Sequence, residues 1–402
     1  MDRLLQSIAA RQARRVELLR HWCGINSGTT HLAGLARMEA ELIDAFDVLD
    51  PDHVRKVALP PASTVDAAGN VAPAPLGHAL VFTKRAAAPL RVLLNIHYDT
   101  VYPAEHPFQR IDLVDAETIR GPGAVDAKGG IVVMLSALEA LESSSACRGI
   151  GWEVILNPDE EIGSPGSAAL LAEAAKRNHV GLVFEPAFAD GMLVGSRNGS
   201  GTFTAVVRGR AAHAGRDFDK GRSAILALTE FIQRADAAQA GQSGVIINCG
   251  SVQGGGAAIN IVPDLAIARF NVRATTAPDQ QVVERIFADA SAEVARRDGI
   301  AVTVLGGFLA PPKLLDERTA ALLDHAIACG RELGLSLNHR HSGGTCDGNK
   351  LAAAGLPTID SLGPVGGGMH SDREYVHLPS LTERAQLTAL LLARLATGQI
   401  RV

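Results

Sequence analysis

The sequence predicts an α/β protein with a mostly parallel sheet covered by helices on both faces, into which a second, α+β domain is inserted. Three observations support this prediction. The 402 residues exceed what one ordinary hydrophobic core holds. From about Leu90 to Leu193, apolar strand-like runs alternate with helical patterns. From about Asn198 to Ala310 the rhythm changes, which predicts a self-contained unit.

The first of these stretches alternates strands and helices in order. We expect strand RVLLNIH from Arg91, helix GGIVVMLSALEALE from Gly129, strand GWEVILN from Gly151, helix SPGSAALLAEAAKR from Ser164 and strand VGLVF from Val180. The last helix is predicted to begin with Ser164 as its N-cap and Pro165 at its first position. Strands separated by helices are typical of a parallel sheet.

The inserted stretch has a different order of elements. Strand GTFTAVVRG, helix SAILALTEFIQRADA, strands GVIINCGSVQGG and IVPDLAIARFNVRAT, helix DQQVVERIFADASAEVARR and strand AVTVLGGF follow one another. This β-α-β-β-α-β order is that of a ferredoxin-like, split βαβ sandwich. We therefore predict an inserted domain over residues 198–310 and a discontinuous α/β domain over 1–197 and 311–402, closed by a helix from about Ser380 to Thr397.

The composition excludes several classes of protein. Hydrophobic residues make up 47% and charged residues 20%, which is typical of a globular chain rather than a disordered one. With 4% aromatic residues, a net charge of −5 and no basic run, we expect no nucleic-acid partner. No apolar run reaches the length of a membrane span, so we expect no membrane partner and a cytoplasmic location. The five scattered cysteines include no CxxC pair, which argues against a thiolate zinc site.

Polar side chains gather where the predicted strands end. They are His97, Asp99, Asp126, Glu160, Glu161, Glu185 and His370. Three of the segments involved close a strand, one is the loop GPGAVDAKGG before a helix, and one is a late glycine-rich loop. In an open α/β sheet the ligand crevice lies outside the carboxyl ends of the strands, so these groups can converge there.

Two histidines and three carboxylates form a sensible ligand set for two zinc ions, although cobalt or manganese would suit the same donors. We assign Asp126 as the carboxylate that bridges the two ions. His97 and Glu185 would hold one ion, and Glu161 and His370 the other. Asp99, two residues after His97 on the same strand, can accept the second ring N–H of that histidine.

Glu160 and Glu161 are adjacent and precede a turn, GSPGS, so both can reach the crevice. One would be a ligand, and the other would take a proton from a metal-bridging water and pass it to the leaving amine. Position alone does not decide between them. Each motif alone is weak evidence, and their joint order along one α/β pattern carries the prediction.

These residues lie in motifs that resemble a known family. The motifs are HYDTV at His97, GPGAVDAKGG, NPDEEIGSPGS, VFEPA at Glu185, AAHAG at His213, NIVPDLAIARFNVR from Asn260 and GPVGGGMHSDREYV through His370. The chain resembles the di-zinc metallopeptidases that include glutamate carboxypeptidase, acetylornithine deacetylase and succinyl-diaminopimelate desuccinylase, with the glutamate carboxypeptidase branch nearest. The resemblance implies a zinc exopeptidase-like fold, Glu160 as general base, Glu161 as ligand and a cis peptide bond after Asp126.

The resemblance also gives the inserted domain a role as a lid that forms a homodimer interface. His213 looks like the family histidine that reaches the neighbouring subunit's site and stabilises the oxyanion. Arg273 and Asn260 look like the grip on a substrate carboxylate, for which an Arg fork is well suited. Gly343 and Gly344 look like a backbone platform near the substrate.

The chain departs from the family pattern at two points. Cys346 follows the glycine platform, which weakens the case for strict glutamate preference, and Pro122 stands where many relatives have Arg.

Three functions remain open at this point. The first is a carboxypeptidase-type hydrolase that cuts a peptide or amide bond beside a free carboxylate, with glutamate as a candidate product. The second is an N-acyl-amino-acid deacylase with the same di-zinc chemistry. The third is an inactive binding or scaffold homologue, whose mark would be loss of the base or of a ligand; neither loss occurs here. The expected substrate is a small peptide or an N-acyl amino acid.

Overall fold

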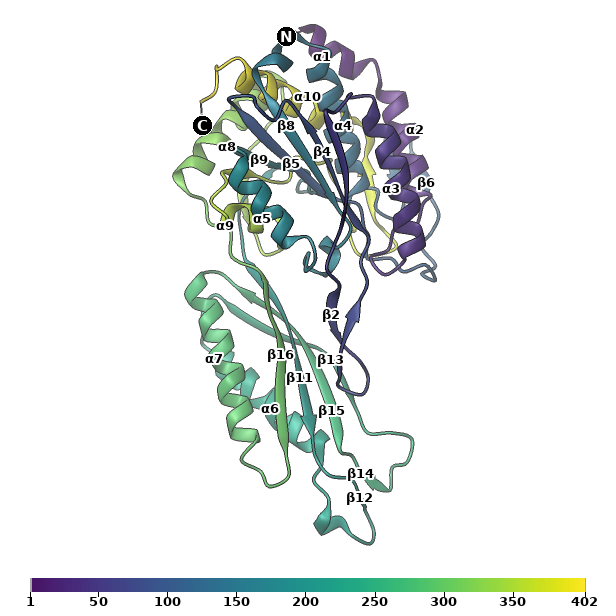
Figure 1. Cartoon of the computed structure of the whole chain (residues 1–402), viewed down its shortest axis with the longest axis vertical. Helices are drawn as coiled ribbons and strands as arrows, with labels where there is room; N and C mark the ends of the chain where they lie inside the picture. Colours follow the sequence, from purple (N-terminus) through teal and green to yellow (C-terminus); the bar gives the residue numbers. More distant parts are fainter. Residues whose placement is uncertain (1, 402) are drawn as a thin grey trace.

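The computed structural model describes residues 2–401 and contains two separate sheets, each with its own helices (Figure 1). The larger sheet has the strand order β1-β4-β8-β5-β9-β18. Its strands are β1 (His53–Ala58), β4 (His78–Lys84), β8 (Gly151–Asn157), β5 (Arg91–His97), β9 (Val180–Val183) and β18 (Thr358–Ile359). Strands β8, β5, β9 and β18 pair in parallel, whereas β1 and β4 form an antiparallel edge. The predicted mostly parallel α/β sheet is therefore confirmed.

Alternate residues of the central strands face two different cores. Leu94 and Val154 pack with the larger group of helices, and their neighbours Leu93 and Ile155 face the smaller group. The larger group comprises α1 (Asp2–Ala9), α2 (Gln12–Cys23), α3 (Leu32–Asp47), α4 (Lys128–Glu142), α8 (Glu317–Glu332) and α10 (Leu378–Ala396), and the smaller one α5 (Ala168–Arg177) and α9 (Asp347–Ala353). Helices thus cover both faces, which explains why these strands are continuous apolar runs.

The prediction that Ser164 caps helix α5 is wrong, because the helix begins later, at Ala168, after Ser167. Ser164 instead has a left-handed backbone with φ of 54°. Its hydroxyl donates to Asp347 on α9 at 2.5 Å. A buried tertiary hydrogen bond therefore outweighs the local Ser-Pro signal.

The second sheet has the order β13-β15-β11-β16 with every neighbouring pair antiparallel. Its elements are β11 (Gly199–Arg208), α6 (Ala224–Gln239), β13 (Val245–Gly254), β15 (Leu265–Ala274), α7 (Ala277–Val294) and β16 (Ala301–Ala310). Phe203, Phe231, Phe270 and Phe287 form an aromatic core between this sheet and its two helices. This sheet lies below the larger one in Figure 1.

The chain passes between the two sheets as a pair of neighbouring strands. Ser200 on β11 lies opposite Ala310 on β16, and the pairing continues as a bridge between Arg197 and Lys313. Both of these side chains bind the buried carboxylate of Asp360, at 2.9 and 2.7 Å. We call this ribbon with its ion cluster the neck.

A hairpin of the larger unit also reaches the second sheet (Figure 1). It consists of β2 (Ala62–Val65) and β3 (Val71–Ala74), and Arg208 and Arg269 of the second sheet donate to its backbone carbonyls. At its tip Gly69 has φ of 74°, and a Cβ there would meet Val206 at 2.7 Å. The hairpin therefore packs on the sheet face that α6 and α7 leave uncovered.

Shorter strands complete the fold. They are β6 (Asp112–Asp115), β7 (Thr118–Arg120), β10 (Leu193–Arg197), β12 (Ala212–His213), β14 (Ile261–Val262), β17 (His339–Ser342), β19 (Gly366–Gly367) and β20 (Tyr375–His377), with 3-10 turns η1 (Ser145–Gly149), η2 (Glu160–Ile162) and η3 (Phe218–Lys220). None of the helices within residues 2–401 combines the length and apolar character needed to cross a bilayer.

Candidate metal centre

The carboxyl ends of three parallel strands place polar groups at one edge of the larger sheet. Strand β5 ends at His97, which lies in register with Asn157, the last residue of β8. The turn η2, with Glu160 and Glu161, follows β8, and Glu185 comes two residues after β9. The expected convergence at the strand ends is therefore a feature of the fold.

Two further loops bring Asp126 and His370 to the same edge. Asp126 Oδ1 lies 3.1 Å from His97 Nε2, and Asp126 Oδ2 lies 3.4 Å from His370 Nε2. His97 Nε2 is also 3.8 Å from Glu185, and His370 Nε2 is 3.3 Å from Glu161. One oxygen of Asp126 therefore faces His97, which lies near Glu185, and the other faces His370, which lies near Glu161. The peptide bond after Asp126 is cis, as the resemblance implied.

This donor set fits a metal centre by its chemistry. One donor atom each of His97, Asp126 and Glu161 lies within 4.8 Å of the others. Imidazole nitrogens and carboxylate oxygens are donors that zinc, cobalt and manganese accept. The structure therefore contains a candidate metal site in which Asp126 lies between His97 and His370.

Burial raises the pKa values of two of the clustered glutamates, whereas contacts with the histidines lower the pKa of Asp126. Burial, together with the charge of Asp126, raises the pKa of Glu161 to about 7 and that of Glu185 to about 8. Contacts with Asp126 and Glu161 raise the pKa of His370 to about 11. Several buried carboxylates at one place repel one another, and cations relieve this repulsion.

Asp99 supports the cluster in two ways. His97 Nδ1 lies 3.0 Å from the backbone oxygen of Asp99 and 3.3 Å from its carboxylate, so both oxygens face the second ring nitrogen. The same carboxylate accepts the backbone N–H groups of Glu160 and Glu161, at 3.2 and 3.3 Å, and the hydroxyl of Thr29 at 2.6 Å. The second role, holding the turn of Glu160 and Glu161, has no signature in the sequence.

Glu160 has the surroundings that a proton acceptor needs. Burial, followed by the negative charge of Glu185, raises its pKa well above the usual range. Within residues 2–401 its carboxylate takes part in no hydrogen bond or ion pair, whereas Glu161 contacts His370. Asp347 and Lys350, a buried ion pair on α9, also influence Glu160 electrostatically.

The predicted substrate groups separate into two sets. Arg273 on β15 lies 3.4 Å from Thr345, and the charge of Glu160 acts on its pKa, which burial lowers. Gly343 and Gly344 follow β17 in the same loop, where Gly344 accepts a hydrogen bond from Arg197 at 3.2 Å. These groups lie on the side of the metal centre.

His213 and Asn260 lie elsewhere. Both are exposed, next to the small β12–β14 ribbon, where Ala214 donates to the carbonyl of Asn260 at 2.8 Å. This ribbon lies at the end of the second sheet farthest from the larger sheet (Figure 1). Within one chain, the structure does not bring these two residues to the metal centre.

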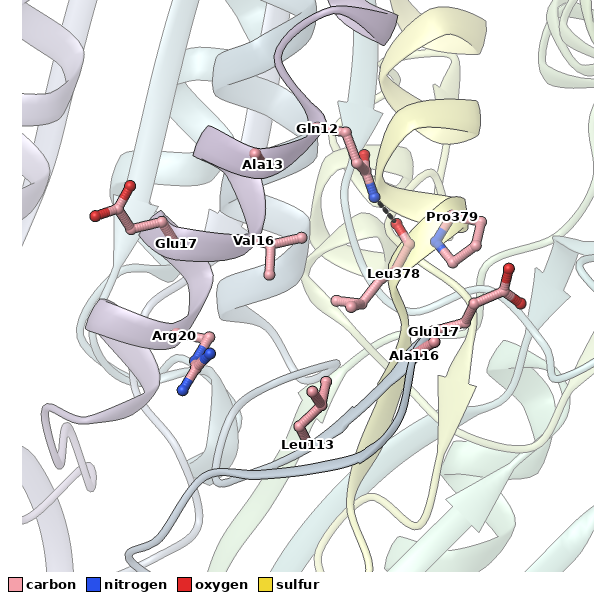
Figure 2. A pocket seen from close by; sticks show the side chains of 10 residues that line it. All are labelled: Gln12, Ala13, Val16, Glu17, Arg20, Leu113, Ala116, Glu117, Leu378 and Pro379. Atoms are coloured by element: carbon pink, nitrogen blue, oxygen red, sulfur yellow. Dashed lines mark hydrogen bonds between the residues drawn. The ribbon is translucent and has the colours of Figure 1, made fainter.

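A groove of about 640 Å³ lies on another part of the surface. Figure 2 shows its wall, formed by α2, the β6–β7 hairpin and the start of α10, with Gln12 bonded to the carbonyl of Leu378. None of the predicted site residues lines it.

Comparison with known proteins places this geometry in a family. The model of peptidase family M20/M25/M40 matches residues 93–394, which include every predicted ligand. The chain belongs to this family. Its members are metallopeptidases and related hydrolases, so the chain is a hydrolase of peptide or amide bonds.

Relatives and solved structures agree with this family membership. Carboxypeptidase G2 from Pseudomonas sp. (strain RS-16) is 31% identical over 77% of this chain and 74% of its own length. Succinyl-diaminopimelate desuccinylase from Alkalilimnicola ehrlichii is 29% identical over 74% of this chain and 82% of its own length. The crystal structure of a tripeptidase from Staphylococcus aureus, 22% identical, covers 96% of this chain and 99% of its own with a TM-score of 0.74. The crystal structure of a family M20 metallo-carboxypeptidase from Sulfolobus solfataricus, 13% identical, covers 95% of this chain and 99% of its own with a TM-score of 0.72.

Proposed function

We propose that the chain is a di-zinc carboxypeptidase-type hydrolase that cleaves an amide bond next to a free carboxylate, with Glu160 as its general base. The observation that carries this proposal is the position of Asp126, whose two oxygens face His97 and His370. We propose His97, Asp126 and Glu185 as ligands of one ion and Asp126, Glu161 and His370 as ligands of the other. When bound, the ions supply a water of lowered pKa, about 7, and polarise the scissile carbonyl.

The remaining steps belong to side chains of the protein. Glu160 accepts a proton from the attacking water and transfers it to the amide nitrogen as the C–N bond breaks. The guanidinium of Arg273 binds the substrate carboxylate, and the Gly343–Gly344 backbone lies along the substrate. Asp99 fixes the ring of His97 and the turn that carries Glu160.

His213 and Asn260 fit this proposal if a second copy supplies them. The second sheet ends in β13, an edge strand on which Ile246 and Val252 are 55% and 58% exposed, and Leu226 on the adjacent α6 is 59% exposed. An exposed apolar edge strand favours pairing with another chain. We therefore propose residues 198–310 as a lid through which a homodimer forms. Each lid would bring His213, as oxyanion donor, and Asn260 to the partner's metal centre.

Deacylation of an N-acyl amino acid is the second candidate, because the desuccinylase relative spans a comparable share of the chain. The test uses zinc-reconstituted protein and a chelated control on a panel of dipeptides, folate-like glutamyl amides and N-acyl amino acids. Metal-dependent release of a C-terminal amino acid, glutamate first, supports the carboxypeptidase. Preference for acetyl or succinyl amino acids would select the deacylase, and cleavage that does not depend on metal would contradict both.

A further inference from the structure

The segment 121–126, which ends at Asp126, is held by one buried side chain from another loop. The carboxylate of Glu374 accepts the N–H of Gly123 on Oε2 at 3.1 Å. On Oε1 it accepts the N–H groups of Val125 and Asp126, each at 3.0 Å. Three backbone donors of the segment therefore converge on a single carboxylate.

The other N–H groups of the segment also have acceptors. Gly121 donates to the backbone oxygen of Glu374 at 3.1 Å, and Ala124 donates to Gly121 at 3.1 Å. The sixth residue is Pro122, which has no N–H group. The proline therefore stands at the one position of residues 121–126 from which this hydrogen-bond network takes no N–H donor. This accounts for the unusual Pro122 of the GPGAVDAKGG motif.

The carboxylate of Glu374 is saturated with donors. Glu374 is 1% exposed. The hydroxyl of Tyr102 lies 2.9 Å from Oε2 of Glu374 and 2.9 Å from the backbone carbonyl oxygen of Ser371. A carboxylate has about four acceptor positions, and three N–H groups with one hydroxyl fill them. A buried charge is stable only when it is compensated in this way.

The position of Glu374 connects two of the proposed ligands. It lies four residues after His370, between β19 and β20, and β20 pairs with β7, which leads into the segment 121–126. The side chain therefore joins the loop of His370 to the loop of Asp126. Across this junction Asp126 Oδ2 lies 3.4 Å from His370 Nε2.

We propose that Glu374 is a positioning residue of the metal centre, which fixes the backbone of Asp126 so that its two oxygens face both ligand groups. This inference rests on the proposed metal centre. Because backbone N–H groups and the hydroxyl of Tyr102 occupy both of its carboxylate oxygens, Glu374 would act through Asp126 and, with Tyr102, through the loop of His370.

The test compares the metal affinity of Glu374→Gln with that of the parent. The amide nitrogen of Gln is a donor and would face the N–H of Gly123 or those of Val125 and Asp126. We expect zinc affinity, measured by competition with a chromophoric chelator, to fall about 10–100-fold. We also expect the absorption spectrum of bound Co²⁺ to change. Glu117→Gln, the same substitution on the exposed β6–β7 hairpin, should leave both unchanged.

These readouts separate positioning from a purely structural role. They are taken well below the unfolding temperature of each metal-free variant, with circular dichroism confirming a folded chain. A folded Glu374→Gln protein with parental zinc affinity and an unchanged cobalt spectrum would overturn the inference. If that variant does not fold, Tyr102→Phe decides: it removes one donor, and we expect a several-fold loss of zinc affinity, whereas parental affinity would overturn the inference.

The outcome is distinguishable from failure of the proposed function. A parent protein that binds zinc but cleaves nothing in the panel would contradict the proposed function and leave the affinity comparison valid. A parent protein that binds no divalent metal would overturn the inference together with the metal centre.

Discussion

His97 and His213 differ in burial and in the contacts of their imidazole rings, although both are predicted site residues. His97 is 1% exposed, and although its Nδ1 faces Asp99, two residues away, its Nε2 faces Asp126 and Glu185 from two other segments. His213 is exposed, and among the described residues 2–401 its Nδ1 accepts only the N–H of Gly215, two residues away. The proposed metal centre is thus assembled from several segments of one chain, whereas the side chain of His213 contacts only its own turn within residues 2–401.

The largest effect is expected at the metal centre. Glu160→Gln removes the proposed proton acceptor but keeps the shape of the side chain, so kcat should fall by about 10²–10⁴-fold while zinc content stays at the parental level. Steady-state kinetics on the best substrate of the panel, with metal analysis, measure both. Glu173→Gln, the same change on the exposed surface of α5, is the control. Parental kcat in Glu160→Gln would remove Glu160 as the base.

The next effect concerns the lid tip. His213→Ala should lower kcat by about 10²–10³-fold, the usual loss for one oxyanion donor, without changing zinc affinity. Because the proposed site is shared, mixing this variant with Glu160→Gln should restore part of the activity as subunits exchange. His53→Ala, on the exposed edge strand β1, should retain parental activity. Absence of rescue despite demonstrated exchange would contradict a shared site.

The smallest effect is a pH dependence to which the buried glutamates of the metal centre contribute. The pKa of Glu185 is raised to about 8 and that of Glu161 to about 7 by burial, above the unfolded value of about 4.3. The metal-free native state therefore binds more protons than the unfolded chain between about pH 4.5 and 8, and its stability falls as pH rises through this window. Metal ions replace those protons.

The increase in melting temperature caused by zinc should consequently be larger at pH 8 than at pH 6. Thermal unfolding followed by circular dichroism, with zinc and with chelator at each pH, tests this. His213→Ala should show the same pH dependence as the parent, since its imidazole lies outside the cluster. A zinc effect that is constant or smaller at pH 8 would contradict the description of the cluster.

The convergence of the proposed ligands at one edge of the sheet could be predicted from the sequence for a physical reason. Strands β5, β8 and β9 are uninterrupted apolar runs that turn polar where they end, and parallel strands end at one edge. His97 and Glu185 are therefore recognisable from the pattern. The family motifs then distinguish Glu160 from Glu161, which the local pattern does not.

The supporting groups could not be predicted in this way. Glu374 acts on backbone N–H groups some 250 positions away, as the separations for Gly123, Val125 and Asp126 show, and no periodicity in either segment marks that contact. Ser164 carries a local helix-start signal that a hydrogen bond to Asp347 outweighs. The location of His213 at the lid tip likewise depends on the length and direction of β11, which the motif AAHAG does not encode.

The neck has a consequence for how such a chain can change over evolutionary time. Arg197 and Lys313 pair with each other and bind the same Asp360. The residues between them therefore form a long insertion whose two ends are held side by side in the larger domain. Because the inserted residues fold into their own sheet and helices, the larger domain loses little stability to the entropy of loop closure. That entropy also grows only slowly with the length of the insertion. Segments of other sizes can then be accommodated between these two points while the host sheet and the proposed metal ligands stay in place, so substrate recognition can diversify while the metal-binding residues are kept.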